Sequence, residues 1–363
     1  MIAYSCGRVK KIVARYPGST ELLVQTPTGT QRALNYHLFT GPVQPGDQVL
    51  LNTTAVELGL GSGGYHFVVA VGDYLHPHPQ PSEPAGHIMK LRYTPLQFSV
   101  LSVEEENSPH HELFHQFETL AGLPVIIGEL HSMLLPAVFN IHRQNPQLKI
   151  AYIMTDGGAL PAAFSHNLAY LKKQRLIAGV ITYGQAFGGD LEAVNIYTAL
   201  IAAKEVLNAH LAVVTMGPGI TGTGTKYGWS GLEQGPIIDA VNTLGGRPLF
   251  IPRISFADQR PRHRGLSHHS ITVLSEIAQT PAQLILPKLP GEKYSHLRAQ
   301  LQEHSLDKKH RLITVTQREE VLDNIRHFGL RLTSMGRTLD QTPCFFLAAG
   351  SAGYYGAQLA STK

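Results

Sequence analysis

Short segments of alternating apolar and polar residues fill the first hundred positions of the chain, and turn residues separate them. The segments cover 7–16, 20–27, 30–38, 42–53 and 63–72, and Pro45–Asp47 is one of the turns. A period of two residues predicts β-strands, and regular turns between short strands favour a barrel. We therefore predict a small antiparallel β-barrel domain, OB-like, over residues 1–103, with a proline-rich exposed loop at 76–86 and returning strands in 90–106.

After about residue 123 the pattern changes to continuous apolar runs that alternate with longer amphipathic segments. Eight runs are predicted as buried strands: 124–130, 149–155, 178–184, 211–217, 247–253, 283–288, 311–316 and 344–349. Strands in alternation with helices are typical of a mostly parallel sheet covered on both faces. The predicted fold class is α/β, with a mostly parallel Rossmann-like sheet that has helices on both faces, preceded by the small antiparallel β-barrel domain. The second domain is predicted over 104–363.

Local signals place the ends of two of the predicted helices. Asp190 is predicted to cap a helix over 191–208, because an aspartate before an amphipathic segment accepts hydrogen bonds from free amides. Thr316 and Glu319 have the spacing of a capping box for a helix over 317–328, which Gly329 would end.

Composition excludes several classes of protein. Charged residues make up 15% and hydrophobic residues 43% of the 363 positions, so a disordered chain is not expected. No uncharged apolar run reaches the roughly 18 residues of a membrane helix, and no contact with a membrane is expected. The first residues lack the apolar core of a secretory signal, which predicts a cytoplasmic protein. A homo-oligomer is compatible with the sequence.

Charge is concentrated at the amino-terminal end. The net charge is +4, and residues 1–40 alone contain five cations against the single anion Glu21. A basic β domain can contact nucleic acid, an acidic protein or simply water, and solvated surface is the simplest interpretation.

A glycine-rich loop follows the predicted strand 211–217. It contains Gly217, Gly219, Gly222 and Gly224, and the first three spell G-x-G-x-x-G. Pro218 interrupts the motif, and no helix opens at once, so a dinucleotide fingerprint is a poor match. Closely spaced glycines can still offer backbone N–H groups to an anion, and we predict that this loop binds ligand.

Two further strand ends carry polar residues. Asp156 and Gly157 follow the strand 149–155, and Gln185 follows the strand 178–184. Ligands of open α/β sheets bind at the carboxyl ends of strands, so these residues are predicted to reach the ligand. Glu129 and His131, at another strand end, form a weaker pair. The literal zinc-peptidase motif H-E-x-x-H at His111–His115 is interpreted as a solvated helix face, because no third ligand follows at a known spacing.

The segment 260–269 is rich in arginine and histidine. Arg262 and Arg264 suit phosphate or carboxylate, and Ser267 could cap a following helix. His263 and His268 are candidate acid–base residues, with Asp156 to orient them, and His269 is a candidate ligand-binding residue. Alternatively, the three histidines together with Asp156 or Asp258 could bind a divalent metal.

Several segments together resemble a bacterial family that is known only as domain of unknown function 3866. They are 51–70, 90–112, 151–165, 181–200, 217–231 and 262–270. The resemblance spans nearly the whole chain and implies a bacterial cytoplasmic protein of this length. It implies no activity, cofactor or catalytic residue.

Two hypotheses of different classes follow. In the first, the α/β domain binds a phosphorylated small molecule or nucleotide and hydrolyses it or transfers a group from it. In the second, the protein is a non-catalytic regulatory or binding module whose basic β domain contacts nucleic acid or a protein partner.

Overall fold

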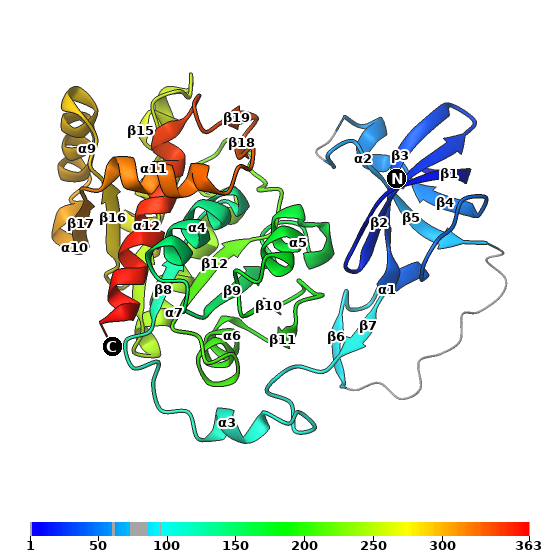
Figure 1. The fold of residues 1–363 in the computed structure, drawn as a ribbon, viewed down its shortest axis with the longest axis horizontal. Coiled ribbons are helices and arrows are strands. Elements are labelled where there is room, and N and C mark those ends of the chain that lie inside the picture. Colours follow the sequence, from blue (N-terminus) through cyan, green and yellow to red (C-terminus); the bar gives the residue numbers. More distant parts are fainter. Residues whose placement is uncertain (1, 60–61, 73–85, 95, 363) are drawn as a thin grey trace. The chain divides into compact units, whose positions relative to one another are not determined.

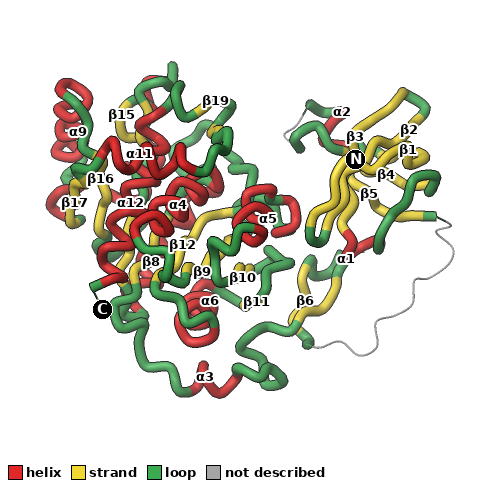
Figure 2. The backbone as a smooth tube through the Cα atoms, in the orientation of Figure 1, coloured by secondary structure: helices red, strands yellow, loops and turns green. Residues whose placement is uncertain are grey.

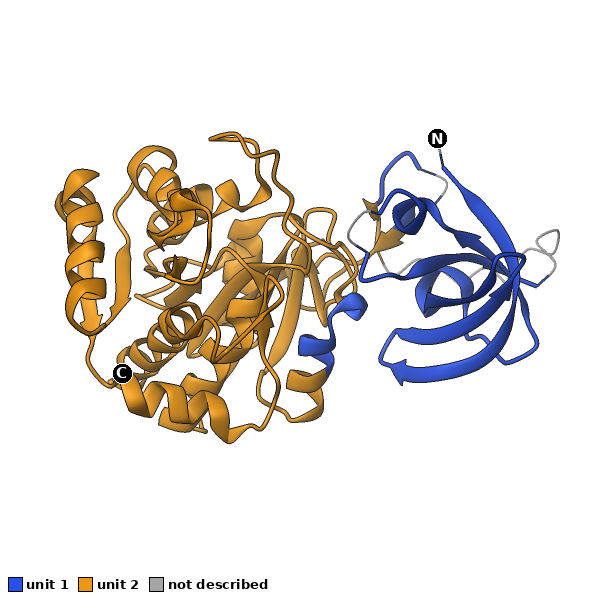
Figure 3. Cartoon of the chain, turned by 90° about the horizontal axis from the view of Figure 1, so that it is seen from above, with its two compact units in different colours: residues 1–84, 91–98, 163–169 blue, residues 85–90, 99–162, 170–363 orange. Residues whose placement is uncertain are grey.

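Two compact units make up the computed structural model, which describes residues 2–59, 62–72, 86–94 and 96–362 (Figure 3). The first unit comprises residues 1–84, 91–98 and 163–169, and the second comprises 85–90, 99–162 and 170–363. Almost all of the predicted proline-rich loop at 76–86 lies outside the described residues. The predicted domain boundary at 103/104 stays a prediction.

The first unit is a closed five-stranded barrel. Its strands pair in the order β1-β2-β3-β5-β4, and β4 closes the barrel against β1. All neighbours are antiparallel except β3 and β5, which are parallel. The predicted barrel is confirmed, and the closer likeness to an OB-fold stays a prediction. The strands are β1 (Tyr4–Tyr16), β2 (Ser19–Thr26), β3 (Gly29–Tyr36), β4 (Gln48–Asn52) and β5 (His66–Val71).

The barrel core is built by the inward positions of the alternating pattern. Val9, Leu22, Val24, Val49 and Leu51 form one buried apolar cluster. Two short helices, α1 (His37–Thr40) and α2 (Thr54–Glu57), connect strands. In the returning segment, β6 (Ile88–Lys90) and β7 (Phe98–Val100) form a two-stranded sheet, in accord with the predicted strands there.

An eight-stranded parallel sheet is the centre of the second unit (Figure 1). Its order is β11-β10-β9-β12-β8-β13-β16-β17, so β12 lies between β9 and β8. Seven of the predicted apolar runs form strands of this sheet. The strands are β8 (Pro124–Ile127), β9 (Ile150–Thr155), β10 (Gly179–Tyr183), β11 (Leu191–Ala193), β12 (Leu211–Met216), β13 (Arg247–Phe250), β16 (Gln283–Pro287) and β17 (Arg311–Val315).

Helices cover both faces of this sheet (Figure 2). One layer contains α4 (Leu134–Gln144), α11 (Arg318–His327) and α12 (Pro343–Ser361), which pack against one another. The other contains α6 (Ile196–Ile201) and α7 (Gln234–Thr243). The two layers follow from right-handed crossovers, since α4 leads from β8 towards β9 whereas α7 leads from β12 in the opposite direction to β13. The remaining helices are α3 (His111–His115), α5 (His166–Lys173), α8 (His268–Thr272), α9 (Gly291–Glu303) and α10 (Leu306–Lys309).

The eighth predicted strand, 344–349, is wrong. These residues belong to α12, which is buried along most of its length and packs on α4. A helix that is covered on all sides is apolar all round, so its sequence has no amphipathic period to distinguish it from a buried strand.

Two predicted capping sites also differ. Asp190 does not cap a helix, because residues 191–193 form β11 and the helix begins after Asn195, whose side chain accepts from Tyr197 N and Thr198 N. The Asp190 carboxylate instead accepts from Val180 N at 2.9 Å. Thr316 lies before Gln317, the N-cap of α11, and makes no capping bond. Gly329 follows that helix with a φ of 65°, as predicted. Among the described residues, no helix is long and apolar enough to cross a membrane.

Candidate functional site

At the carboxyl ends of the neighbouring strands β8 and β13, the chain continues towards opposite sides of the sheet. From β8 the chain passes through α4 to β9 on one side, whereas from β13 it continues to β16 on the other. Such a switch point opens a crevice at the strand ends. Glu129 follows β8 and Arg253 follows β13, so both side chains start from this crevice.

A buried carboxylate joins these two strand ends. Glu129 Oε1 accepts from Arg253 Nη1 at 2.9 Å and from His269 Nδ1 at 2.7 Å, although Glu129 is only 1% exposed. Burial by itself would raise the pKa of Glu129, but the charges and hydrogen bonds of Arg253 and His269 hold that pKa below its usual value. The carboxylate is therefore ionised at neutral pH. Because an ionised carboxylate can only accept hydrogen bonds, the proton shared between Glu129 and His269 lies on His269 Nδ1.

The glycine-rich loop brings an aromatic ring to the same place. Trp229 stacks on His269 with ring centroids 3.8 Å apart and an interplanar angle of 6°. The loop closes on itself through a bridge between Gly222 and Trp229, and Trp229 Nε1 donates to Lys226 O at 3.0 Å. Two sides of the His269 ring are therefore fixed, one by Glu129 and one by the indole.

These elements enclose a cavity of about 200 Å³, which we call the arginine–histidine pocket. Two segments supply most of its wall: the glycine-rich loop and the 260–269 segment. Its lining residues are Ile220, Thr221, Gly222, Gly224, Thr225, Trp229, Arg253, Arg260, Arg262, His263, His268, His269 and Met335.

Three histidines meet at this pocket. Ring centroids of His263 and His268 are 4.8 Å apart, those of His268 and His269 4.4 Å, and those of His263 and His269 5.0 Å. Burial, followed by neighbouring cations, lowers the pKa of His263 to about 3 and that of His268 to about 4. Both rings are neutral at pH 7. A histidine with such a low pKa is a weak base, so the predicted acid–base role fits neither ring well.

Ser267 holds the 260–269 segment in shape. Its side chain caps α8 by accepting from His269 N, as predicted, and it lies 2.8 Å from His263 Nδ1. Because Ser267 already accepts from this helix, the helix end offers fewer free amides to an anion than the sequence suggested.

The arginines of the segment differ in their partners. Arg260 forms two hydrogen bonds with Asp258, at 3.0 and 2.9 Å, and these bonds hold the pKa of Asp258 well below its usual range. Asp258 is thus engaged by arginine and unsuited to a metal. Arg262 lines the pocket, and among the described residues no hydrogen bond or ion pair engages its guanidinium. Arg264 is exposed and lies outside the lining, and its predicted ligand-binding role stays a prediction.

Asp156 and its neighbours form a separate group. Asp156 Oδ2 accepts from Gln185 N at 3.0 Å, and Glu233 accepts from Thr155 Oγ1. Burial raises the pKa of Glu233 to about 7, with the charge of Asp156 acting in the same direction. Asp156, Gly157 and Gln185 do not line the arginine–histidine pocket. The predicted orientation of His263 or His268 by Asp156 is therefore not seen.

The four glycines predicted to bind ligand have different positions in the structure. Gly222 and Gly224 line the pocket, whereas Gly217 and Gly219 do not. A Cβ atom at Gly217 would lie 2.3 Å from Ala159 O, so Gly217 allows two backbone segments to touch.

The H-E-x-x-H segment does not reach this site. It forms the single-turn helix α3, in which His115 Nε2 lies 3.0 Å from His111 Nε2. His111 Nδ1 contacts Glu104 O at 2.7 Å, and Glu112 and His115 are exposed. Groups of three or more ligand-type residues were found only at His263, His268 and His269 within the part of the chain that the structure describes.

A comparison with protein-family models matches residues 32–353 to the family described as "Protein of unknown function (DUF3866)". The chain belongs to this family. No curated protein matches the sequence. Membership of DUF3866 therefore agrees with the resemblance seen in the sequence and leaves the activity open.

Sequence reasoning missed two residues of this pocket, Arg253 and Trp229, and it also missed Glu233 in the separate group around Asp156. Arg253 stands at the end of the apolar run 247–253, and nothing in the sequence distinguishes it from any other charged residue there. Trp229 lies in the loop 217–231, in which only the glycines were interpreted as ligand-binding residues. Glu233 lay in an amphipathic segment and gave no signal at all. Its raised pKa depends on burial and on Asp156, 77 positions away in sequence. Of the weaker pair, Glu129 joined the site, and His131 Nδ1 contacts Met216 O at 3.1 Å.

Proposed function

We propose that this protein binds a phosphorylated small molecule through the arginine–histidine pocket. The observation that carries the proposal is the lining, which holds three arginines and no acidic side chain. Two of these arginines are neutralised, Arg253 by Glu129 and Arg260 by Asp258. Arg262 leaves one guanidinium charge for the ligand, and guanidinium groups bind phosphate oxygens by two parallel hydrogen bonds.

The size of the pocket favours a compact ligand. A cavity of about 200 Å³ is smaller than the roughly 300–1,000 Å³ of pockets that enclose drug-sized molecules. It suits a phosphoryl group with a few further atoms, so the larger part of a nucleotide would extend beyond it. Hydrolysis or group transfer remains the proposed reaction class if the ligand is turned over.

A thermal-shift screen of the full chain tests this proposal. Inorganic phosphate, small phosphate monoesters and nucleotides are compared with carboxylates and neutral sugars. A ligand at 100 times its dissociation constant adds about 2.7 kcal/mol to the native state, which should raise the melting temperature by several degrees. Shifts by phosphate esters that vanish in Arg262→Gln and persist in Arg264→Gln support the proposal. Shifts that are equal in both variants contradict it.

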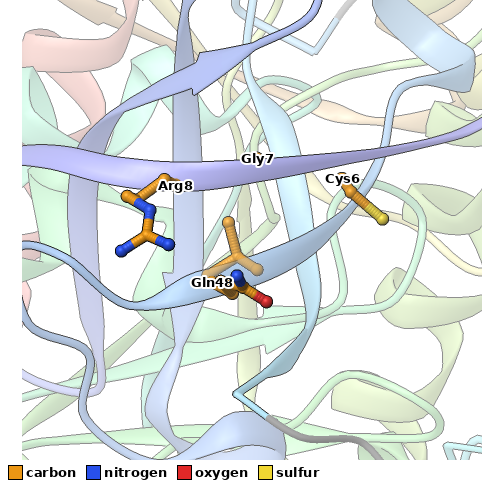
Figure 4. Close-up of a pocket in the computed structure, with 5 residues that line it drawn as sticks. Cys6, Gly7, Arg8 and Gln48 are labelled. Carbon is orange, nitrogen blue, oxygen red and sulfur yellow. The ribbon is translucent and has the colours of Figure 1, made fainter.

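A second candidate function rests on the barrel. Strand β1 exposes Arg8, Lys10, Lys11 and Arg15, and Tyr4 on the same strand is 53% exposed. Beside this strand, a hollow of about 240 Å³ is lined by Cys6, Gly7, Arg8, Gln48 and Val49 (Figure 4). A row of cations with an exposed aromatic ring suits a nucleic-acid backbone and its bases.

Binding of a short single-stranded oligonucleotide at several salt concentrations tests this candidate. Replacing Lys10 and Lys11 by alanine should weaken binding and reduce the salt slope by about 1.4, since each lost phosphate contact removes about 0.7. The control replaces Lys173 and Arg175, two exposed cations of the second unit. An equal effect of the two double variants would reject a specific role of β1.

A further inference from the structure

The three histidines of the arginine–histidine pocket have the arrangement of metal ligands. His263, His268 and His269 each offer a ring nitrogen, and these nitrogens all lie within 4.8 Å of one another. Ligand nitrogens of a tetrahedral zinc ion lie about 3.3 Å apart, given zinc–nitrogen bonds of about 2.0–2.1 Å. Rotations of the side chains that bring each nitrogen less than about 1 Å inwards would satisfy this geometry.

Hydrogen bonds at Nδ1 fix two of the three rings. His269 Nδ1 donates to Glu129 at 2.7 Å, and His263 Nδ1 lies 2.8 Å from Ser267 Oγ. Among the described residues, no hydrogen bond occupies Nε2 of either ring. Metal-binding histidines commonly donate their second ring nitrogen to a carboxylate, which orients the ring and increases its basicity. Glu129 therefore has the position of an outer-shell carboxylate.

The third ring carries an unsatisfied atom. His268 Nε2 is buried and has no hydrogen-bond partner among the described residues. A buried polar atom without a hydrogen-bond partner reduces the free energy of unfolding. A bound ligand or ion that contacts His268 Nε2 would remove this cost. Trp229, stacked on His269, adds a rigid wall on one side of the cluster.

Charge does not forbid a cation at this place. Arg253, which lines the pocket beside His269, is neutralised by Glu129, and Arg260 is neutralised by Asp258. Arg262 also lines the pocket and its charge acts on His268, so an anion bound to the metal would balance that charge.

We propose that His263, His268 and His269 bind one zinc ion, with a fourth coordination position open towards the pocket. Three protein ligands and an open position are typical of catalytic zinc sites, in which the metal polarises a bound oxygen. The site stands independently of phosphate binding. Where both hold, an oxygen of the anion or a water molecule would take the open position.

Titration of zinc alone into the full, metal-free chain tests the site, after any affinity tag has been removed. Calorimetry should show one zinc ion per chain, and cobalt in its place should give the strong visible bands of four-coordinate Co²⁺. Quenching or enhancement of Trp229 fluorescence should accompany binding, because this is the single tryptophan of the sequence.

His268→Ala is the decisive variant, since His268 is less buried than His263 and its loss should leave the fold intact by circular dichroism. It should weaken zinc binding by more than the roughly 10- to 100-fold that loss of an outer-shell partner costs. Glu129→Gln should weaken binding within that range. The matched control His111→Ala/His115→Ala removes the other histidine pair and should leave the titration unchanged. An unchanged affinity in His268→Ala, or loss of binding in the control, overturns the proposal.

Discussion

Glu129 holds two side chains of the pocket wall, Arg253 and His269. Its carboxylate is almost fully buried and engages side chains from two other segments, Arg253 and His269, which are more than 120 positions away in sequence. Replacement of one member of such a set leaves a buried charge without its partner. The residue therefore links the stability of the second unit to the shape of the pocket.

Glu129→Gln should reduce the free energy of unfolding of the second unit by about 3–5 kcal/mol, because Arg253 would remain buried without a countercharge. Urea unfolding followed by tryptophan fluorescence measures this directly, since Trp229 lies in the pocket. Asp323→Asn, which removes an exposed ion pair with Arg326, is the control and should change stability little. Equal stability of the two variants would contradict the account of Glu129.

Glu233 makes the stability of the second unit depend on pH. Its folded-state pKa of about 7 lies above the value of 4.5 in an unfolded chain, so the folded protein keeps a proton that the unfolded chain has released. Stability from this group is therefore present below about pH 4.5 and is lost as the pH rises towards 7. The loss is at most about 3 kcal/mol.

Glu233→Gln mimics the neutral form and should escape this loss. The difference in unfolding free energy between Glu233→Gln and the unaltered protein should grow in favour of the variant from pH 4.5 to 7.5. Other titrating groups contribute equally to the unfolding free energies of both proteins, so their contributions cancel in that difference. Glu303→Gln, at an exposed position of α9, should show no such trend. A pH-independent difference for Glu233→Gln would show that the carboxyl titrates normally.

At the scale of elements, α12 shows that an apolar pattern can predict burial without distinguishing a helix from a strand. A run of apolar residues correctly indicated burial at 344–349, but burial on all sides hides the helical period. Close packing of α12 on α4 accounts for the helix at these positions. A Cβ atom at Gly353 would lie 2.1 Å from Ala137 O, so glycine lets α12 approach the backbone of α4.

Gly353→Ala should therefore destabilise the second unit by about 1–3 kcal/mol, since the two helices must separate to accept the methyl group. Gly356→Ala in the same helix is the matched control. Its added Cβ would meet side-chain atoms of Ile126 and Leu249, at 3.0 and 3.4 Å, and no backbone atom of another segment is among its three nearest neighbours. Alanine also favours the helix by up to about 1 kcal/mol. Thermal unfolding of both variants should rank Gly356→Ala above Gly353→Ala. The reverse order would contradict the packing described for α12.

At the scale of the whole molecule, the barrel and the parallel sheet could be predicted because each rests on a local period. The composition of the site could be predicted only in part. Strand order is set by long-range packing, and β12 lies between β9 and β8. Asp156 at the end of β9 is therefore two strands away from Glu129 at the end of β8, and the sequence offered no sign of that separation. The 260–269 segment was found because its arginines and histidines are neighbours in sequence.

The central claim is that Arg262 presents an unneutralised charge to a phosphate group in the arginine–histidine pocket. Calorimetric titration of a small phosphate monoester into the full chain, with Arg262→Gln and Arg264→Gln beside it, tests this claim most directly. Loss of one charged hydrogen-bonding partner costs about 1.5–3 kcal/mol, so Arg262→Gln should weaken binding by roughly 10- to 100-fold. Arg264→Gln should bind as the unaltered protein does. Equal affinity in all three proteins, or an equal loss in both variants, would contradict the account.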